Sequence, residues 1–462
     1  MASMLSSDQS KLLTPAPADS GKPLRIAFLT YRGKAHCGGQ GVYTRHMARA
    51  LTDLGHHVEV FSGQPYPEVD DDIILHKLES LDIFNDHFPG RMPGFWEIKS
   101  LPDFAELTSF LGGSFSEPLG FSLRAWQELK PRLDEFDLVH DNQTLGYGIL
   151  GIQNDGLPVL QTIHHPITVD RRLEIEHART LLEQIGKRRW YSFTRMQTRV
   201  AKRMRRVMTV SENSFEDVHA DHEVPRDRMV VVPVGVDPQL FRPRPDVDRI
   251  PGMVLTTASA DVPLKGLRYL LEAIAKLRTE RPDVHLVIIG KPKEGGTAMQ
   301  TLDRLGLTDH VTWISGVSDE RIVELYSQCE VAVVPSLYEG FSLPAIEAMS
   351  SGACLVATNG GALPEVVGED GDTAIVVETE SGDALAVGIA KALDDPELRD
   401  RLGTAGRERV VNHWSWSHTA LKTIEQYRIL LAEVASEPSP SAAPGQSGLA
   451  ATFGKLTRKL GR

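Results

Sequence analysis

The sequence predicts an α/β protein made of two doubly wound, Rossmann-like domains, each with a parallel sheet, that face each other across a cleft. Its 462 residues exceed the usual size of one domain, so two domains of similar size are expected. Short β-branched runs alternate with helical patterns along two long stretches, which is typical of βαβ units. Ligands bind such folds at the carboxyl ends of the strands, so the cleft is the expected site.

The first stretch, residues 23–236, is predicted to form the N-terminal domain. It begins with a strand-like run at 24–30, a Gly-rich loop, a helical pattern near 42–54 and a second strand-like run at 57–62. Later apolar runs continue the alternation, at 137–141, 158–164, 206–211 and 229–235. Residues 1–22 are polar and rich in Ser, Ala and Pro, without the apolar stretch of a secretory signal, and we expect a disordered leader.

A charged, proline-rich segment at 237–252 is predicted to be the linker, because proline blocks regular structure. The alternation resumes in residues 253–414, the predicted C-terminal domain, with strand-like runs at 253–259, 284–290, 311–316, 331–336 and 354–358. Helical patterns follow at 381–406 and 415–435. Residues 436–462 are of low complexity and then basic, which favours a disordered tail.

Composition excludes several classes of protein. No apolar run approaches the ~18 residues of a membrane span, and a net charge of −12 disfavours general nucleic-acid binding. Cys37, Cys329 and Cys354 suit neither a disulfide framework nor a thiolate metal site. A soluble enzyme of the reducing cytoplasm fits this composition best.

The most specific motif is "YEGFSLPAIEAMSSG" at 338–352, in which a loop carrying Glu339 leads into a helix carrying Glu347. Pro344 fits the first helical position, and Gly340 permits a turn that presents backbone N–H groups. The unpaired N–H groups of Phe341, Ser342 and Leu343 at the start of a helix suit an anion. The alternative is a capped surface helix with two ordinary glutamates.

This segment resembles the Glu-(seven residues)-Glu signature of glycosyltransferase family 4, the retaining enzymes of the GT-B fold known as glycosyl transferases group 1. The following "GACLVATNGGALPEVV" at 352–367 is similar to the usual continuation of that signature. The resemblance implies that Glu339 contacts the donor sugar and that Glu347 binds the nucleotide ribose. It also implies that 23–236 is the acceptor-side domain, that 253–414 binds the nucleotide sugar, and that 415–435 returns to the first domain.

The Gly-rich loop "KAHCGGQGVY" at 34–43 allows the backbone to approach a diphosphate closely. A tight turn or a dinucleotide site are the alternatives, but the third glycine of the dinucleotide fingerprint would fall at Thr44. The glycine pair of the family matches Gly38 and Gly39.

Lys265 stands where the family carries a lysine that neutralises the donor diphosphate. The arginine usually found five residues earlier is Ala260 here. Either Arg268 or an arginine of the first domain replaces its charge, or donor affinity is weaker.

The sequence "TIHHP" at 162–166 ends a predicted strand of the first domain, where the family places a histidine near the donor sugar and the reacting carbon. Register with the strand favours His164, although a histidine at a strand end is often only a packed or capping residue. His165 and Asp170 are candidates for acceptor contacts.

Residues 187–206 hold nine basic residues and no acidic one, with apolar residues at helical spacing. Such a helix either packs its apolar stripe on the first domain or contacts anionic lipid or a phosphorylated acceptor. Residues 449–462 are also basic and amphipathic, a weak membrane-surface anchor or a disordered tail. The protein is therefore expected in the cytoplasm, either free or peripheral at the inner face of the membrane.

The predicted activity is transfer of a hexose from a UDP- or GDP-linked donor to a hydroxyl acceptor that is lipid-linked, anionic or neither, without a metal or another cofactor. Lys265, the Gly38–Gly39 loop and the 341–343 amides would stabilise the leaving diphosphate. The resemblance implies front-face transfer, in which the leaving phosphate helps to deprotonate the acceptor. A nucleotide-sugar epimerase, a phosphorylase of the same architecture and a catalytically silent sugar-nucleotide-binding paralogue are the rival functions.

Overall fold

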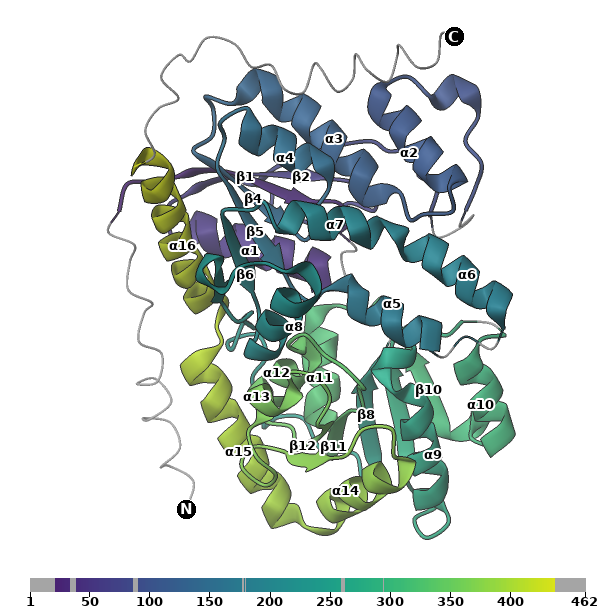
Figure 1. The fold of residues 1–462 in the computed structure, drawn as a ribbon. Helices are drawn as coiled ribbons and strands as arrows, with labels where there is room; N and C mark the ends of the chain where they lie inside the picture. Colours follow the sequence, from purple (N-terminus) through teal and green to yellow (C-terminus); the bar gives the residue numbers. More distant parts are fainter. Residues whose placement is uncertain are drawn as a thin grey trace, which may run out of the picture.

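The computed structural model describes residues 21–33, 39–85, 90–176, 178, 180–258, 262–293 and 295–436. These residues form two sheets whose neighbouring strands are all parallel, with helices packed around each sheet (Figure 1). The sheets have seven strands in the order β3-β2-β1-β4-β5-β6-β7 and six in the order β10-β9-β8-β11-β12-β13. The predicted α/β fold with two doubly wound parallel sheets is confirmed, whereas the predicted domain boundaries stay a prediction.

The first sheet and its helices come from the N-terminal half of the chain. Its strands are β1 (Arg25–Thr30), β2 (His57–Ser62), β3 (Ile74–Lys77), β4 (Leu138–Asn142), β5 (Val159–Ile163), β6 (Arg206–Thr209) and β7 (Met229–Val231). Its helices are α1 (Gly39–Asp53), α2 (Leu101–Leu111), α3 (Glu117–Leu129), α4 (Tyr147–Asn154), α5 (Ile167–Glu176), α6 (Leu181–Trp190), α7 (Thr194–Ala201) and α8 (Glu212–His222). The central strands β4 and β5 are buried over their whole length, although they carry polar residues such as His140, Asp141 and Gln161.

The second sheet follows from Met253 onward. Its strands are β8 (Met253–Thr257), β9 (His285–Ile289), β10 (Val311–Ile314), β11 (Val331–Val334), β12 (Leu355–Thr358) and β13 (Ile375–Val377). Its helices are α9 (Leu267–Arg278), α10 (Thr297–Leu305), α11 (Asp319–Gln328), α12 (Leu343–Ser350), α13 (Leu363–Val367), α14 (Gly382–Asp394) and α15 (Pro396–His413); the last helix, α16 (Trp416–Ser436), follows them. In α12 the first helical residue is Leu343, so Pro344 is the second residue and not the first.

The segment predicted as helical at 381–406 contains two helices, because the backbone leaves helical geometry at Asp395. The Asp395 side chain accepts a hydrogen bond from the backbone N–H of Leu398 and so caps α15, whose first residue is Pro396. A cap followed by proline at the first helical position is a strong start signal, which ends α14 at Asp394.

The predicted basic helix at 187–206 is also not continuous. A 3₁₀ turn at Tyr191–Phe193 separates α6 from α7, and the chain leaves helical geometry after Ala201. Met196, Val200 and Met204 lie in the core of the first sheet's layer. The apolar stripe of this segment therefore packs on its own domain, whereas α6 has no buried residue.

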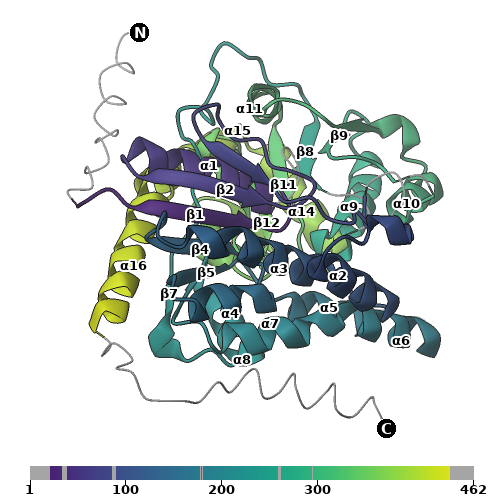
Figure 2. The ribbon, with the colours of Figure 1, turned by 90° about the horizontal axis from the view of Figure 1, so that it is seen from above.

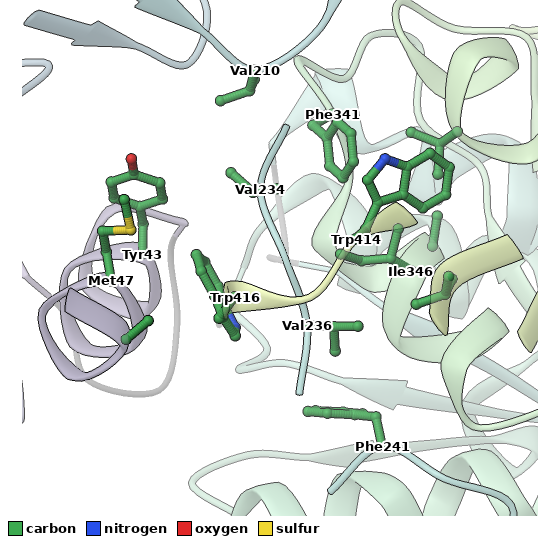
Figure 3. Packing of buried hydrophobic residues seen from close by; sticks show 14 of the residues in the cluster. Tyr43, Met47, Val210, Val234, Val236, Phe241, Phe341, Ile346, Trp414 and Trp416 are labelled. Atoms are coloured by element: carbon green, nitrogen blue, oxygen red, sulfur yellow. The ribbon is translucent and has the colours of Figure 1, made fainter. Parts of the chain in front are cut away.

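Two chain crossings join the halves of the molecule. The segment after β7 pairs with the segment after α15 through a parallel bridge between Val236 and Ser415, and a Cβ on Gly235 would lie 2.4 Å from the Ser415 backbone. Trp414 packs edge-on against Phe341, while Trp416 packs against Tyr43 of α1 (Figure 3). One hydrophobic cluster thus runs from the first sheet's layer into the second.

Helix α16 lies against the first sheet's layer, where it contacts α1, as both views of the ribbon show (Figures 1 and 2). The buried Tyr427 hydroxyl is 2.6 Å from Nδ1 of His140 on β4. The C-terminal helix therefore returns to the first half of the molecule. Among the described residues, none of the helices combines the length and apolar character of a membrane span.

Candidate functional site

Lys265 and Glu339 form an ion pair where the carboxyl ends of β8 and β11 lie side by side. Lys265 Nζ donates to both carboxylate oxygens of Glu339, at 2.8 and 3.1 Å. The Ser336 hydroxyl donates to the same carboxylate at 2.7 Å. The Glu339 side chain is 10% exposed, against 32% for Lys265, so the ammonium is the more accessible partner.

Local backbone geometry fixes this pair. The N–H of Leu337 donates to the carbonyl of Leu264 at 2.8 Å, which ties the Glu339 loop to the 3₁₀ turn that carries Lys265. Gly266 follows with φ of 63°, and a Cβ there would meet the Pro335 carbonyl oxygen at 1.8 Å. Only glycine allows both the left-handed backbone and this close approach.

The loop that follows Glu339 presents free backbone donors at the start of α12. Among the described residues, the N–H groups of Phe341, Ser342 and Leu343 have no hydrogen-bond acceptor. Ser342 has φ of 96°, and within the described part of the chain its buried hydroxyl also has no partner. Non-glycine residues with positive φ are rare and often mark functional sites. The Phe341 side chain is buried against Trp414, so this residue can offer only its backbone to a ligand.

Glu347 lies on the first turns of α12, half-buried beside Tyr326 of α11. Burial, and then the charge of Asp319, raise the pKa of Glu347 to about 7, although the Tyr326 hydroxyl opposes the shift. Asp319 is itself 3.7 Å from Arg45 of α1. The Glu347 carboxyl group therefore changes between its charged and neutral forms near neutral pH.

His164 directly follows β5 and is held through its ring and its backbone. Asn142 Nδ2 donates to the carbonyl of Gln40 and to Thr44 Oγ1, so Asn142 Oδ1 accepts from His164 Nε2 at 2.7 Å. Burial, and then His165, lower the pKa of His164 to about 3. The ring is therefore neutral, with its proton on Nε2 and its lone pair on Nδ1.

The neighbouring residues His165 and Asp170 form a second pair, with Nε2 of His165 2.9 Å from the Asp170 carboxylate. The His165 ring centroid lies 6.2 Å from that of Tyr338, the residue before Glu339. Both side chains are partly exposed, as groups that meet an acceptor must be.

The two halves of the site meet at Gly340. A Cβ on Gly340 would lie 2.5 Å from the His164 carbonyl oxygen, so the backbone after Glu339 touches the backbone of His164. The structure therefore brings His164 and Glu339 to one place. Gly38 and Ala260 lie outside the described residues; Gly39 is the first residue of α1, with open space where a Cβ would be.

Sequence reasoning missed Asn142, Ser336 and Ser214, whose hydroxyl is 2.8 Å from the His164 carbonyl oxygen. Asn142 is the last residue of β4, and a polar residue at the carboxyl end of a parallel strand was a usable signal. Over the residues that the structure describes, no three His, Cys, Asp or Glu side chains gather as metal ligands would.

Comparisons with known proteins place this geometry in a family. A model of glycosyltransferase family 4 matches residues 37–240, and a model of glycosyl transferases group 1 matches residues 252–409. The MMP alpha-(1->4)-mannosyltransferase of Mycolicibacterium hassiacum is 47% identical over 414 residues, which cover 89% of this chain and 100% of that protein. The chain belongs to glycosyltransferase family 4. This family 4 chain is therefore a glycosyltransferase of glycan biosynthesis.

More distant relatives of this family 4 glycosyltransferase agree. The D-inositol 3-phosphate glycosyltransferase of Streptomyces avermitilis is 28% identical, with 88% of each chain covered. Among solved structures, sucrose-phosphate synthase of Thermosynechococcus elongatus has a TM-score of 0.68 at 22% identity, covering 89% of this chain and 100% of that one. HepE of Anabaena in complex with UDP-glucose has a TM-score of 0.65 at 17% identity, covering 88% and 100%. The shared architecture is the two-domain GT-B fold, as predicted.

Proposed function

We propose that this glycosyltransferase is a retaining hexosyltransferase that moves a hexose from a UDP- or GDP-linked sugar to a hydroxyl acceptor. The observation that carries the proposal is the Lys265–Glu339 pair beside the unpaired amides of the 341–343 loop. One cation and several N–H donors are what a departing diphosphate needs. A bound diphosphate would draw Lys265 away from Glu339 and free that carboxylate for the donor sugar hydroxyls.

The remaining residues take complementary roles in the proposal. Gly38 and Gly39 would let the first domain's loop approach the diphosphate, and Glu347 would accept hydrogen bonds from the ribose hydroxyls. His164 would contact the donor sugar near the reacting carbon. His165 and Asp170 would contact the acceptor, which their partial exposure supports.

The state of His164 bears on the proposed mechanism. Since its pKa is lowered to about 3, its ring is a poor base at neutral pH. We therefore propose front-face transfer: the acceptor oxygen forms its bond to the anomeric carbon on the face that the phosphate leaves. The leaving phosphate oxygen takes the acceptor proton, and no metal is needed.

Relatives narrow the substrates to test. The 47% identical relative is an α-(1→4)-mannosyltransferase, which supports mannose as the hexose and the 4-hydroxyl of a sugar, such as an α-mannoside, as the acceptor. The UDP-glucose held by HepE supports a nucleotide-sugar donor in general. GDP-mannose and UDP-glucose are therefore the first donors to compare.

Calorimetry tests the donor site. We expect one nucleotide sugar to bind the wild-type protein and to bind Glu347→Ala more weakly, whereas exposed Glu425→Ala matches the wild type. Equal affinity of Glu347→Ala would remove Glu347 from the site. Donor isomerisation without acceptor would indicate an epimerase, sugar 1-phosphate formed with inorganic phosphate a phosphorylase, and binding without turnover a silent paralogue.

We also propose that the protein works in the cytoplasm and meets the membrane through α6. Leu181, Leu182 and Ile185 are 68, 82 and 44% exposed, and Lys187, Arg188 and Arg189 lie in the last turn of the same helix. Exposed apolar and basic residues on one short helix are typical of interfacial binding. The exposed apolar residues of this proposal precede the predicted basic segment 187–206, which contributes only its first basic residues, because the apolar stripe after Trp190 is in the core.

Sedimentation with liposomes tests this contact. Anionic vesicles should bind the protein and release it in salt, and replacing Leu181 and Leu182 by Ser and Arg188 by Gln should weaken binding. The tail at 449–462, a second predicted anchor, lies outside the described residues and is tested by its deletion. If neither change affects sedimentation, the acceptor is better sought among soluble glycans.

A further inference from the structure

Helix α8 of the first half is capped by a carboxylate of the second half. The side chain of its N-cap residue, Ser211, accepts a hydrogen bond from the N–H of Ser214. The N–H groups of Glu212 and Asn213 then have no partner inside the helix. Both donate to the Glu365 carboxylate, at 2.8 and 2.7 Å. Glu365 belongs to α13, which packs on α12 and β12 of the second sheet. A carboxylate at a helix start is stabilised by both hydrogen bonds and the helix dipole.

The same helix also holds the loop around Glu339. The Ser211 hydroxyl donates to the Gly340 carbonyl at 2.6 Å. The Tyr338 hydroxyl donates to Asp217, one turn further along α8, at 2.6 Å. The two residues that flank Glu339 in the sequence are thus both bound to α8.

Helix α8 is bound to the histidine as well. The Ser214 hydroxyl lies 2.8 Å from the His164 carbonyl oxygen and 3.1 Å from the Gly340 carbonyl oxygen. The position of His164 relative to Glu339 therefore depends on where the first turn of α8 sits. The carboxylate of Glu365 binds that first turn from the opposite half of the molecule.

We propose that Glu365 is a positioning residue for sugar transfer, a latch that caps α8 and so aligns His164 with the Glu339 loop. The inference rests on the proposed transferase function, although the cap itself does not. Glu365 is exposed and its side chain fills no core, so its removal leaves the fold intact. Its effect reaches the reacting atoms through α8.

Variants of Glu365 test the latch. Glu365→Ala removes both acceptors, Glu365→Gln keeps one and loses the charge, and Glu369→Ala is an exposed control four residues away. The measurements are kcat and donor Kd with GDP-mannose and methyl α-mannoside, together with hydrogen exchange of the Glu212 and Asn213 amides. A misplacement of about 1 Å can cost ~100-fold in rate, so we expect kcat of Glu365→Ala to fall ~10- to 100-fold.

The expected pattern is faster exchange of both amides and a lower kcat, with a smaller change in donor Kd, because Lys265 and Glu347 lie in the second half. The kcat and exchange rates of Glu365→Gln should lie between those of Glu365→Ala and the wild type. Those of Glu369→Ala should match the wild type. Wild-type kcat in Glu365→Ala, or a donor Kd that weakens as much as kcat falls, would overturn the positioning role. If the Glu212 and Asn213 amides of Glu365→Ala exchange at the wild-type rate, Glu365 does not cap the helix. If the wild-type protein transfers no sugar, the proposed function fails, while exchange still decides the cap.

Discussion

Lys265 donates to both oxygens of Glu339, so the cation proposed for the diphosphate is paired with the carboxylate proposed for the sugar. The pair orients both side chains, and the Ser336 hydroxyl would still hold Glu339 if the ammonium turned to a phosphate. Preorganised charge of this kind costs little reorganisation during the reaction. The pair thus joins, in one contact, the two groups proposed for the two ends of the donor.

Replacing Lys265 by Ala should slow transfer ~100-fold or more, because one preorganised charge at the leaving group is lost. Thermal unfolding should change less than the rate, since the Glu339 carboxylate keeps the hydrogen bond from Ser336 when the ammonium is removed. Lys276→Ala, which breaks an exposed pair with Asp383, is the control. Equal rates for the two variants would show that another base carries the phosphate charge.

Gly340→Ala should reduce kcat ~100-fold, since reacting groups displaced by about 1 Å lose that much rate. The added methyl would lie 2.5 Å from the His164 carbonyl oxygen and push the two loops apart. Gly186→Ala on α6 is the matched control, because nothing lies within 4 Å of its added Cβ. A fully active Gly340→Ala enzyme would mean that the two loops separate during turnover.

Glu347→Gln should stabilise the fold above pH 7 and weaken donor binding. The raised pKa, about 7, means that the folded protein holds a proton that the unfolded chain releases near pH 4.5. Wild-type stability from this group is therefore full below pH 4.5 and is lost as the pH rises through 7. We expect the variant to be more stable by about 3 kcal/mol at pH 8 and to lose this advantage near pH 4.5.

Donor affinity should change with pH in the opposite direction to the stability of the fold. The ionised carboxylate accepts hydrogen bonds from the ribose hydroxyls more strongly, so the donor affinity of the wild type should rise as the pH passes 7. Glu347→Gln should bind the donor more weakly, with an affinity that does not change with pH. Chemical denaturation and calorimetry at pH 5, 7 and 8 measure both properties. Parallel pH profiles for wild type and variant would assign the titration to another group.

Tyr427→Phe should lower the free energy of unfolding by about 1–3 kcal/mol, the cost of leaving a buried polar atom unpaired. The lost partner is Nδ1 of His140, whose ring is buried and neutral, with a pKa of about 3. Activity at 25 °C should persist, since the pair lies away from Lys265 and Glu339. Glu425→Ala, on the exposed face of α16, should leave unfolding unchanged and serves as the control.

The fold was readable from the sequence because most of the buried strands are short runs with apolar residues followed by a helical pattern. The loop of Glu339 and the helix of Glu347 could also be predicted, because both lie in one continuous segment of the sequence. Breaks inside helical stretches were harder to see. Asp395 and the turn at 191–193 end helices whose apolar spacing continues past them.

Contacts between distant segments could not be predicted. Glu365 meets the start of α8 across more than 150 positions, and Tyr427 meets His140 across 287. Nothing local distinguishes Glu365 from another exposed glutamate on a short helix. Its role depends on how the two halves pack, which a single sequence does not encode as a pattern.

The stereochemistry of transfer tests the central claim most directly. Proton NMR of a reaction with GDP-mannose and methyl α-mannoside shows the anomeric configuration of the new glycosidic bond, which does not mutarotate. The proposed front-face mechanism predicts an α-linked product from the α-linked donor, with no product in Lys265→Ala on the same time scale. A β-linked first product would contradict retention and the roles proposed for this site.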